Sequence, residues 1–256
     1  MSEAEGYPGI GRVLVVIPTY NEADNVRMIT ERVRQAVPEA DILVADDSSP
    51  DGTGAIADRM AAQEPRIQVL HRPTKEGLGK AYLAGFRWAL AHDYDVIGEI
   101  DADGSHQPEQ LPSLLAALED ADLVIGSRWV AGGSVTNWAF TRELLSRGGN
   151  LYTRLLLGIH VRDATAGYRL FRRTTLEKID LDDVSSYGYV FQADLAFRTL
   201  RAGLRVVEVP IEFVERVRGD SKMTRDVATE SLRRITRWGL VERRRQLRER
   251  LSRRAA

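Results

Sequence analysis

Short apolar runs alternate along the first half of the chain with longer segments whose apolar residues recur at helical spacing. The apolar runs, rich in Val, Ile and Leu, predict buried strands at 12–18, 41–47, 66–70, 95–100 and 121–127. The intervening segments predict helices at 25–37, 54–62, 78–91 and 110–118. Such an alternation is typical of a mostly parallel sheet with helices on both faces.

The second half of the chain is less regular. Its pattern predicts a loop at 132–138, a helix at 142–157, a strand-like segment at 163–173, a helix at 190–201 and a strand at 204–214. No internal repeat or linker interrupts the pattern. A length of 256 residues suits one large domain, so the sequence predicts a single α/β domain.

Composition excludes several kinds of protein. The chain has no cysteine, which excludes disulfides, thiolate catalysis and thiolate metal sites. Residues 1–11 are polar and glycine-rich, so we expect a flexible N-terminus without a signal peptide. No apolar run reaches eighteen residues, and no membrane-spanning helix is expected.

Charge is distributed unevenly around a formal net value of −1. Residues 225–256 contain eleven arginines and four acids, a net charge of +7, which leaves −8 for residues 1–224. Leu232, Ile235 and Trp238 recur at helical spacing within this tail. The pattern predicts a basic amphipathic C-terminal helix over 225–256 whose partner is polyanionic.

Acidic residues gather where the predicted strands end. The segment 99–109 (EIDADGSHQPE) follows one strand, and DDSSPDG at 46–52 and PTYNE at 18–22 follow two others. Ligands of parallel sheets bind at the carboxyl ends of the strands. Carboxylates crowded at such an edge repel one another unless a cation offsets them, and a hard divalent cation prefers oxygen ligands. Asp101 and Asp103 are therefore candidate metal ligands.

Two nucleotide-binding motifs fit poorly. GTGAIA at 52–57 matches the dinucleotide pattern, but its glycines lie beyond two acids, and the next strand ends in His71 rather than an acid. TKEGLGKA at 74–81 resembles a phosphate loop but lacks its first glycine and its final hydroxyl residue. Neither motif supports a dinucleotide or P-loop site.

An ordered set of motifs resembles glycosyltransferase family 2, and more narrowly its polyprenyl-phosphate (dolichol-phosphate) mannose synthases. The matching segments are 18–22 (PTYNE), 46–53 (DDSSPDGT), 76–82 (EGLGKAY), 101–106 (DADGSH), 125–128 (IGSR), 164–171 (ATAGYRLF) and 216–222 (RVRGDSK). The resemblance implies a GT-A fold over residues 12–224. It also implies transfer of a sugar, with inversion, from a nucleotide sugar.

The resemblance implies the following roles. Pro18, Tyr20 and Glu22 help to hold the nucleotide, and Ala45 and Asp47 lie against its base and ribose. Asp101, Ala102 and Asp103 bind the diphosphate and a Mg²⁺ or Mn²⁺ ion, whose coordination Ser105 completes. Arg128, Arg216 and Lys222 face the phosphates, and Arg142 is a weaker candidate for the acceptor phosphate. Asp101, Asp103 and Arg128 are the expected catalytic residues.

The reaction that this resemblance implies moves mannose from GDP-mannose to a polyprenyl phosphate. A lipid phosphate is already anionic at neutral pH, so we expect no obligatory catalytic base and a mainly structural role for His106. UDP-glucose as donor, a hydroxyl acceptor served by Asp163 as the nearest later acid, and a non-catalytic nucleotide-sugar-binding regulator remain alternatives.

A lipid acceptor implies work at a membrane. Because the implied acceptor is a membrane lipid, we expect the basic tail to bind an anionic membrane surface rather than nucleic acid. We therefore expect a cytoplasmic protein held peripherally on the inner face of the membrane.

Overall fold

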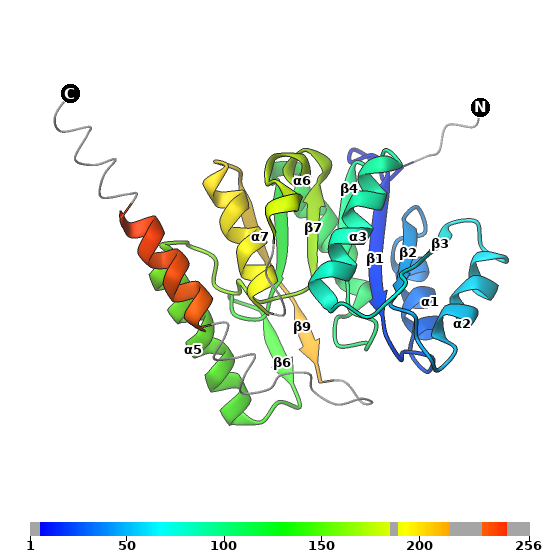
Figure 1. Cartoon of the computed structure of the whole chain (residues 1–256), viewed down its shortest axis with the longest axis horizontal. Helices are drawn as coiled ribbons and strands as arrows, with labels where there is room; N and C mark the ends of the chain where they lie inside the picture. Colours follow the sequence, from blue (N-terminus) through cyan, green and yellow to red (C-terminus); the bar gives the residue numbers. More distant parts are fainter. Residues whose placement is uncertain (1–5, 185–188, 216–231, 245–256) are drawn as a thin grey trace.

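The computed structural model describes residues 6–184, 189–215 and 232–244. Seven strands form the central sheet in the order β3-β2-β1-β4-β7-β5-β8 (Figure 1). Their bounds are Val13–Thr19 (β1), Asp41–Asp46 (β2), Ile67–His71 (β3), Val96–Glu99 (β4), Leu123–Ser127 (β5), Arg169–Arg172 (β7) and Val206–Pro210 (β8). Neighbouring strands are parallel except at β7, which runs antiparallel to both β4 and β5.

Helices cover both faces of this sheet because its strands are apolar on both sides. Leu14 and Val16 of β1 belong to one core cluster, whereas Val15 and Ile17 belong to the other. One face carries α1 (Val26–Ala36), α2 (Thr53–Ala61) and α4 (Leu111–Ala117), and the other carries α3 (Leu78–Ala91), α6 (Arg173–Lys178) and α7 (Tyr189–Arg201). The mostly parallel α/β domain predicted from the sequence is confirmed.

The second half of the chain differs from the prediction in several places. The expected strand-like segment at 163–173 is a strand only in β7 and is followed directly by α6, which the sequence pattern did not predict. The expected strand at 204–214 is two strands in two sheets, since β9 (Glu212–Val214) leaves the main sheet after Pro210, which has no N–H to donate. The expected loop at 132–138 contains β6 (Ser134–Thr136), which pairs with β9 in a parallel two-stranded sheet. A three-residue strand formed by non-local pairing leaves no periodic signal in the sequence.

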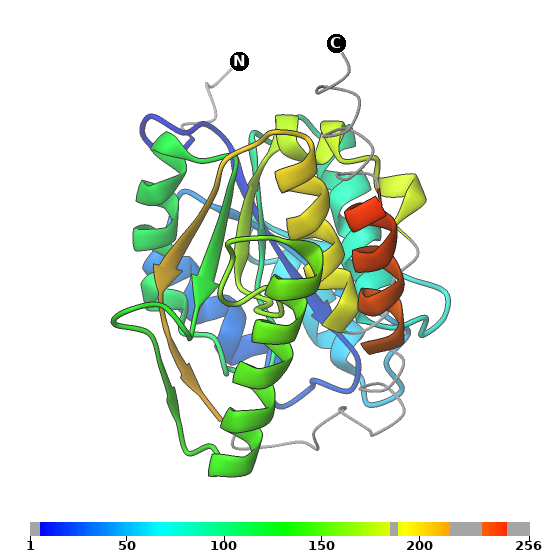
Figure 2. The same cartoon turned by 90° about the vertical axis from the view of Figure 1, so that its left-hand side faces the viewer.

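The last described helix, residues 232–244, packs along α5 (Phe140–Leu157) (Figures 1 and 2). The Tyr152 and Thr236 hydroxyls lie 2.6 Å apart, and Arg243 donates to the Leu155 carbonyl oxygen at 2.8 Å. A Cβ added at Gly239 would lie 2.8 Å from the Leu156 carbonyl oxygen, so this glycine allows the helices to approach closely. Ile235 is buried against the domain, and Trp238 packs on the same core.

None of the helices in the described ranges combines the length and the apolar character needed to cross a lipid bilayer.

Two helical glycines provide a matched test of the packing between α3 and β1. A Cβ at Gly85 would lie 2.5 Å from Val16 Cγ1, whereas a Cβ at Gly148 in α5 would meet nothing within 4 Å. We expect Gly85→Ala to lower the free energy of unfolding by about 1–3 kcal/mol, because the buried sheet must shift. Gly148→Ala should raise it by about 0.5–1 kcal/mol through helix propensity. Urea denaturation of both variants measures the difference, and equal effects would contradict this account of the contact.

Candidate functional site

The loops that follow β1 and β2 are joined into one unit at the carboxyl edge of the sheet. The backbone N–H of Asn21 donates to Ser49 Oγ at 3.1 Å, and that of Glu22 donates to Thr53 Oγ1 at 3.0 Å. Lys75 Nζ lies 3.7 Å from the centre of the Tyr20 ring. Tyr20 and Glu22, both predicted nucleotide contacts, are thus held by hydrogen bonds between loops and by a cation on the tyrosine ring.

Two adjacent acids at the end of β2 have different partners. Asp46 accepts hydrogen bonds from the hydroxyls of Thr19 at 2.9 Å and Ser49 at 2.6 Å, which makes it an internal brace. Asp47 forms an ion pair with Arg72, whose other Nη group is 3.0 Å from Glu76. Burial raises the pKa of Asp47, although Arg72 acts in the opposite direction. Asp47 therefore has a fixed position at the edge of the sheet.

The predicted residues Pro18 and Ala45 are buried within β1 and β2. The Ala45 side chain belongs to the core cluster with Leu14 and Val16. These two residues therefore shape the ends of the strands from within the fold.

The segment after β4 brings Asp101 and Asp103 to the same edge. The Tyr82 hydroxyl donates to Asp101 at 3.1 Å, and burial, aided by the nearby carboxylates, raises the pKa of that phenol well above its usual value. The Asp101 side chain is 31% exposed. Asp103 accepts a hydrogen bond from the backbone N–H of Ser105 at 3.0 Å. Ala102 and Ser105 are both buried beside them.

Two acids close to Asp101 and Asp103 in the sequence, Glu99 and Glu109, have their charge removed or offset in the structure. Glu99 is fully buried, and burial raises its pKa to about 8, so it is mainly protonated at neutral pH. Glu109 lies on the outside of the segment and pairs with Arg32 at 2.6 Å. Glu99 and Glu109 therefore contribute little to the repulsion between carboxylates that the sequence suggested for this segment.

His106 is a buried, neutral side chain between aromatic rings. Its ring lies 5.2 Å from those of Tyr168 and Phe213, measured between centroids. Burial lowers the pKa of His106 to about 4, and its Nδ1 accepts from the backbone N–H of Asp101 at 3.5 Å. This packing agrees with the structural role expected for the histidine.

Arg128, at the end of β5, is held by the fully buried Asp163. Its Nε and Nη2 atoms donate to the two oxygens of that carboxylate at 2.7 and 2.6 Å, and its backbone N–H donates at 3.0 Å. The Arg128 guanidinium also lies 5.5 Å from the centre of the Trp138 ring. Arg142 lies 4.1 Å from the same ring and pairs with Glu215. The structure thus brings Arg128 and Arg142 to one aromatic residue.

Arg216 and Lys222, the other predicted phosphate-facing cations, lie outside the described residues. Within the described ranges, no group of three or more His, Asp or Glu side chains forms a metal-binding cluster. Asp101 and Asp103 nevertheless offer the hard carboxylate oxygens that suit Mg²⁺ or Mn²⁺, ions that commonly take remaining ligands from substrate phosphates and water.

Sequence reasoning missed the supporting residues Arg72, Lys75 and Tyr82. Tyr82 and Glu76 stand at the ends of the motif EGLGKAY, yet the motif gave no indication that Tyr82 donates to Asp101 or that Glu76 helps to hold Arg72. Arg72 directly follows β3 and carried no motif of its own. Side-chain contacts across the sheet edge can be predicted only when the strand order is known, and the spacing of residues along the chain does not reveal that order.

A doubly covered sheet with acids and an anchored arginine at its ligand edge fits the GT-A class of glycosyltransferases, and comparison with known proteins shows that class. The chain belongs to glycosyl transferase family 2, whose family model matches residues 14–180. An undecaprenyl-phosphate mannosyltransferase from Micrococcus luteus is 57% identical over 240 residues, which span 94% of this chain and 99% of the relative.

Two further proteins agree with this assignment. A polyprenol monophosphomannose synthase from Mycolicibacterium smegmatis is 54% identical over 231 residues, 90% of this chain and 87% of the relative. The crystal structure of glucosyl-3-phosphoglycerate synthase from Mycobacterium tuberculosis shares the fold with a TM-score of 0.65 at 21% identity, covering 91% of this chain and 79% of that one. The predicted family and the predicted GT-A fold are confirmed.

The buried carboxyl of Glu99 should make the free energy of unfolding depend on pH. Between pH 4.5, its ordinary pKa, and about 8, the unfolded chain releases this proton while the folded protein retains it. The free energy of unfolding should therefore fall as pH rises through this window. Glu99→Gln lacks this dependence, so its stability relative to wild type should grow by on the order of a few kcal/mol across the window.

Urea denaturation at several pH values, with chelator present, tests this expectation. Glu119→Gln removes an exposed carboxyl and serves as the control. Parallel pH profiles for wild type and Glu99→Gln would show that Glu99 is not protonated in the folded state.

Proposed function

We propose that this protein transfers mannose from GDP-mannose to a polyprenyl phosphate, with inversion, to give a β-linked polyprenyl-phosphate mannose. Two relatives of more than half identity, which the chain matches over nearly its whole length, are named undecaprenyl-phosphate mannosyltransferase and polyprenol monophosphomannose synthase. The donor nucleotide and the metal ion are part of the proposal.

The observation that carries the proposal is the state of Asp163. A transferase that acts on a hydroxyl acceptor needs a base at this part of the site, and Asp163 was the sequence candidate. Its carboxylate is fully buried and accepts two hydrogen bonds from the Arg128 side chain, so it is not available to remove a substrate proton. An acceptor that brings its own anionic oxygen suits such a site, because a phosphate monoester is largely ionised at neutral pH.

The residues divide the work as follows. Tyr20, Glu22 and Asp47 hold the nucleoside end of the donor, together with the buried strand ends at Pro18 and Ala45. Asp101, Asp103 and Ser105, with the intervening Ala102 backbone, would hold Mg²⁺ or Mn²⁺, which when bound offsets negative charge on the diphosphate. Arg128, whose guanidinium is held in place by Asp163, is proposed to contact the phosphates together with Arg216 and Lys222.

The transfer of the sugar requires no catalytic base from the protein. An oxygen of the acceptor phosphate forms a bond to the anomeric carbon while the bond from that carbon to the GDP oxygen breaks. The electron pair leaves with GDP, and no proton has to be removed from the acceptor. We propose that Arg142, which shares the Trp138 ring with Arg128, binds the acceptor phosphate.

We propose that the protein works peripherally at the inner face of the cytoplasmic membrane, where residues 225–256 meet anionic lipid. Within this tail, Ile235 and Trp238 pack on the domain, so they are not the side chains that would enter a membrane. Leu240 and Val241 on the same helix are exposed and better suited to that contact.

Donor and metal can be tested together by ligand-induced thermal stabilisation. We expect GDP to raise the melting temperature more than UDP does, and only with Mg²⁺ or Mn²⁺ present. Asp103→Asn should abolish the metal-dependent part and lower mannosyl transfer by about 10²–10³-fold or more, since charge at the leaving diphosphate is then poorly offset. Asp120→Asn, an exposed carboxyl elsewhere, is the control. Stronger stabilisation by UDP, together with turnover of UDP-glucose, would contradict GDP-mannose as the donor and identify UDP-glucose instead.

Asp163 can be tested as a positioning residue rather than a base. Asp163→Ala leaves Arg128 buried without its carboxylate, which should lower the free energy of unfolding by about 3–5 kcal/mol. Asp182→Asn, which removes an exposed pair with Arg87, should cost at most about 1 kcal/mol. Urea denaturation and the pH dependence of transfer provide the readouts. Unchanged stability together with loss of the acidic limb of the pH profile would instead identify Asp163 as a base.

A further inference from the structure

One side of α5 exposes large apolar side chains. Phe140 is 76% exposed and Leu144 61%, and Leu151 and Leu155 are exposed as well. Spacings of four, seven and four residues put these four side chains on one helical stripe. A row of this kind on a surface helix marks a contact with a partner or a lipid surface.

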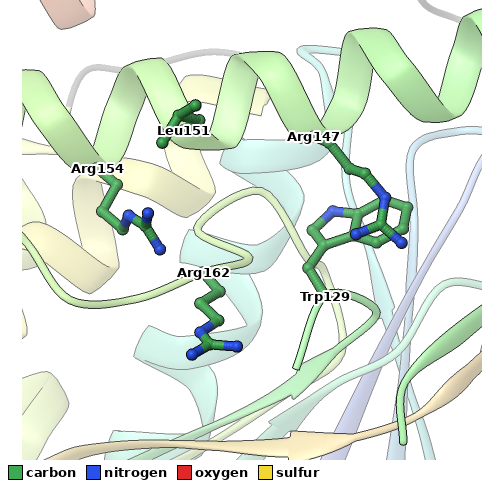
Figure 3. A pocket seen from close by; sticks show the side chains of 5 residues that line it. All are labelled: Trp129, Arg147, Leu151, Arg154 and Arg162. Atoms are coloured by element: carbon green, nitrogen blue, oxygen red, sulfur yellow. The ribbon is translucent and has the colours of Figure 1, made fainter. Parts of the chain in front are cut away.

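A pocket of about 360 Å³ adjoins this stripe and is lined by basic side chains. Its residues are Trp129, Arg147, Leu151, Arg154 and Arg162 (Figure 3). Leu151 belongs both to the pocket and to the apolar stripe. The pocket lies next to the candidate site, because Trp129 directly follows Arg128 and Arg162 directly precedes Asp163.

The polar atoms of the pocket are arranged for an anion. Trp129 is 8% exposed, and its Nε1 donor is buried without a hydrogen-bond partner among the described residues. That nitrogen lies on the ring edge that faces Leu151 and Arg154 (Figure 3). The Arg147 guanidinium lies 4.2 Å from the centre of the Trp129 ring. An N–H donor and three guanidinium groups together suit phosphate oxygens.

Little negative charge offsets these arginines. Arg147 donates to Glu143 at 2.7 Å, an exposed pair within one helix. In the described part of the chain, neither Arg154 nor Arg162 has an ion pair through its side chain, and the nearby Glu208 carboxylate accepts from the backbone N–H groups of Arg162 and Asp163 at 2.8 and 2.9 Å. A second copy of this chain docked on the stripe would bring like charges together. An anionic bilayer supplies both the phosphates and the apolar boundary that such a surface needs.

The neighbouring helix extends the same surface. Residues 232–244 are fixed on α5 by Tyr152, Thr236 and Arg243, and they expose Leu240, Val241 and basic side chains of their own. Amphipathic helices with leucine on one face and arginine beside it bind in the headgroup region of membranes.

We propose that the α5 face, defined by Phe140, Leu144, Leu151 and Leu155, docks on an anionic phospholipid bilayer, with a headgroup phosphate seated in the arginine pocket of Arg147, Arg154 and Arg162. The inference deepens the proposed function, since a polyprenyl-phosphate acceptor requires the enzyme at a membrane. It differs from attachment by the C-terminal tail in the residues that make the contact.

Vesicle co-sedimentation of the full chain, without donor or acceptor, tests the proposal. Phosphatidylcholine vesicles are compared with vesicles that contain about one third phosphatidylglycerol. The Arg147→Gln/Arg154→Gln/Arg162→Gln variant should bind the anionic vesicles on the order of 100-fold more weakly than wild type. Arg27→Gln/Arg59→Gln/Arg87→Gln makes the same change in net charge on exposed helices at other surfaces and should bind like wild type. Leu144→Ser/Leu155→Ser should weaken binding without changing the charge.

The other outcomes overturn the proposal. Equal binding by the two triple-arginine variants would assign membrane contact to the tail or to overall charge. Arginine-dependent thermal stabilisation by inorganic phosphate, with no vesicle binding by wild type, would identify a site for a small soluble anion. Because vesicle binding is measured without substrates, its failure would leave mannosyl transfer to a short-chain, detergent-dispersed acceptor unaffected. Absence of that transfer with intact vesicle binding would count against the proposed function instead.

Discussion

The constraint on which the rest of the structure depends is the gathering of carboxylates at one edge of a low-dielectric sheet. The charge of each buried acid there is stabilised or removed in a different way. Asp46 accepts hydroxyl hydrogen bonds, Asp47 pairs with Arg72, Glu99 keeps its proton, and Asp163 holds Arg128. Asp101 and Asp103 lie half-buried at the same edge, where their carboxylates can bind a cation carried by a diphosphate. The surrounding network therefore fixes the neighbouring acids and keeps Asp101 and Asp103 together at one place.

The same network gives the site its rigidity. Hydrogen bonds join the loops after β1 and β2, the Tyr82 hydroxyl fixes Asp101, and the buried pair of Arg128 and Asp163 connects β5 to the segment before β7. A buried ion pair is weak support for stability but strong support for orientation, because removal of either partner leaves an uncompensated charge. Arg128 thus acts from a position that the fold determines before any ligand arrives.

Much of the first half of the fold could be predicted because its strands are buried on both faces, which makes them continuous in Val, Ile and Leu. The gathering of the strand-end acids could also be predicted, because the carboxyl ends of parallel strands meet at one edge of the sheet. The insertion of β7 between β4 and β5, and the pairing of β6 with β9, depend on contacts between distant segments and left no local signal. Gly239 illustrates the same limit: its place in the sequence, directly after Trp238, indicates no packing role, but in the structure it is the point where two helices touch. The roles of Arg72 and Tyr82 depend on the placement of β2, β3 and α3 side by side, which the sequence does not reveal.

The central claim is that Asp101 and Asp103 hold a metal-bridged nucleotide at this edge. Its most direct test is an anomalous-scattering map from crystals of the full chain grown with Mn²⁺ and GDP. We expect one manganese peak within bonding distance of the Asp103 carboxylate and the diphosphate, with the guanosine next to Asp47. GDP bound at this edge with no manganese on Asp101 or Asp103, or GDP bound elsewhere, would contradict the account.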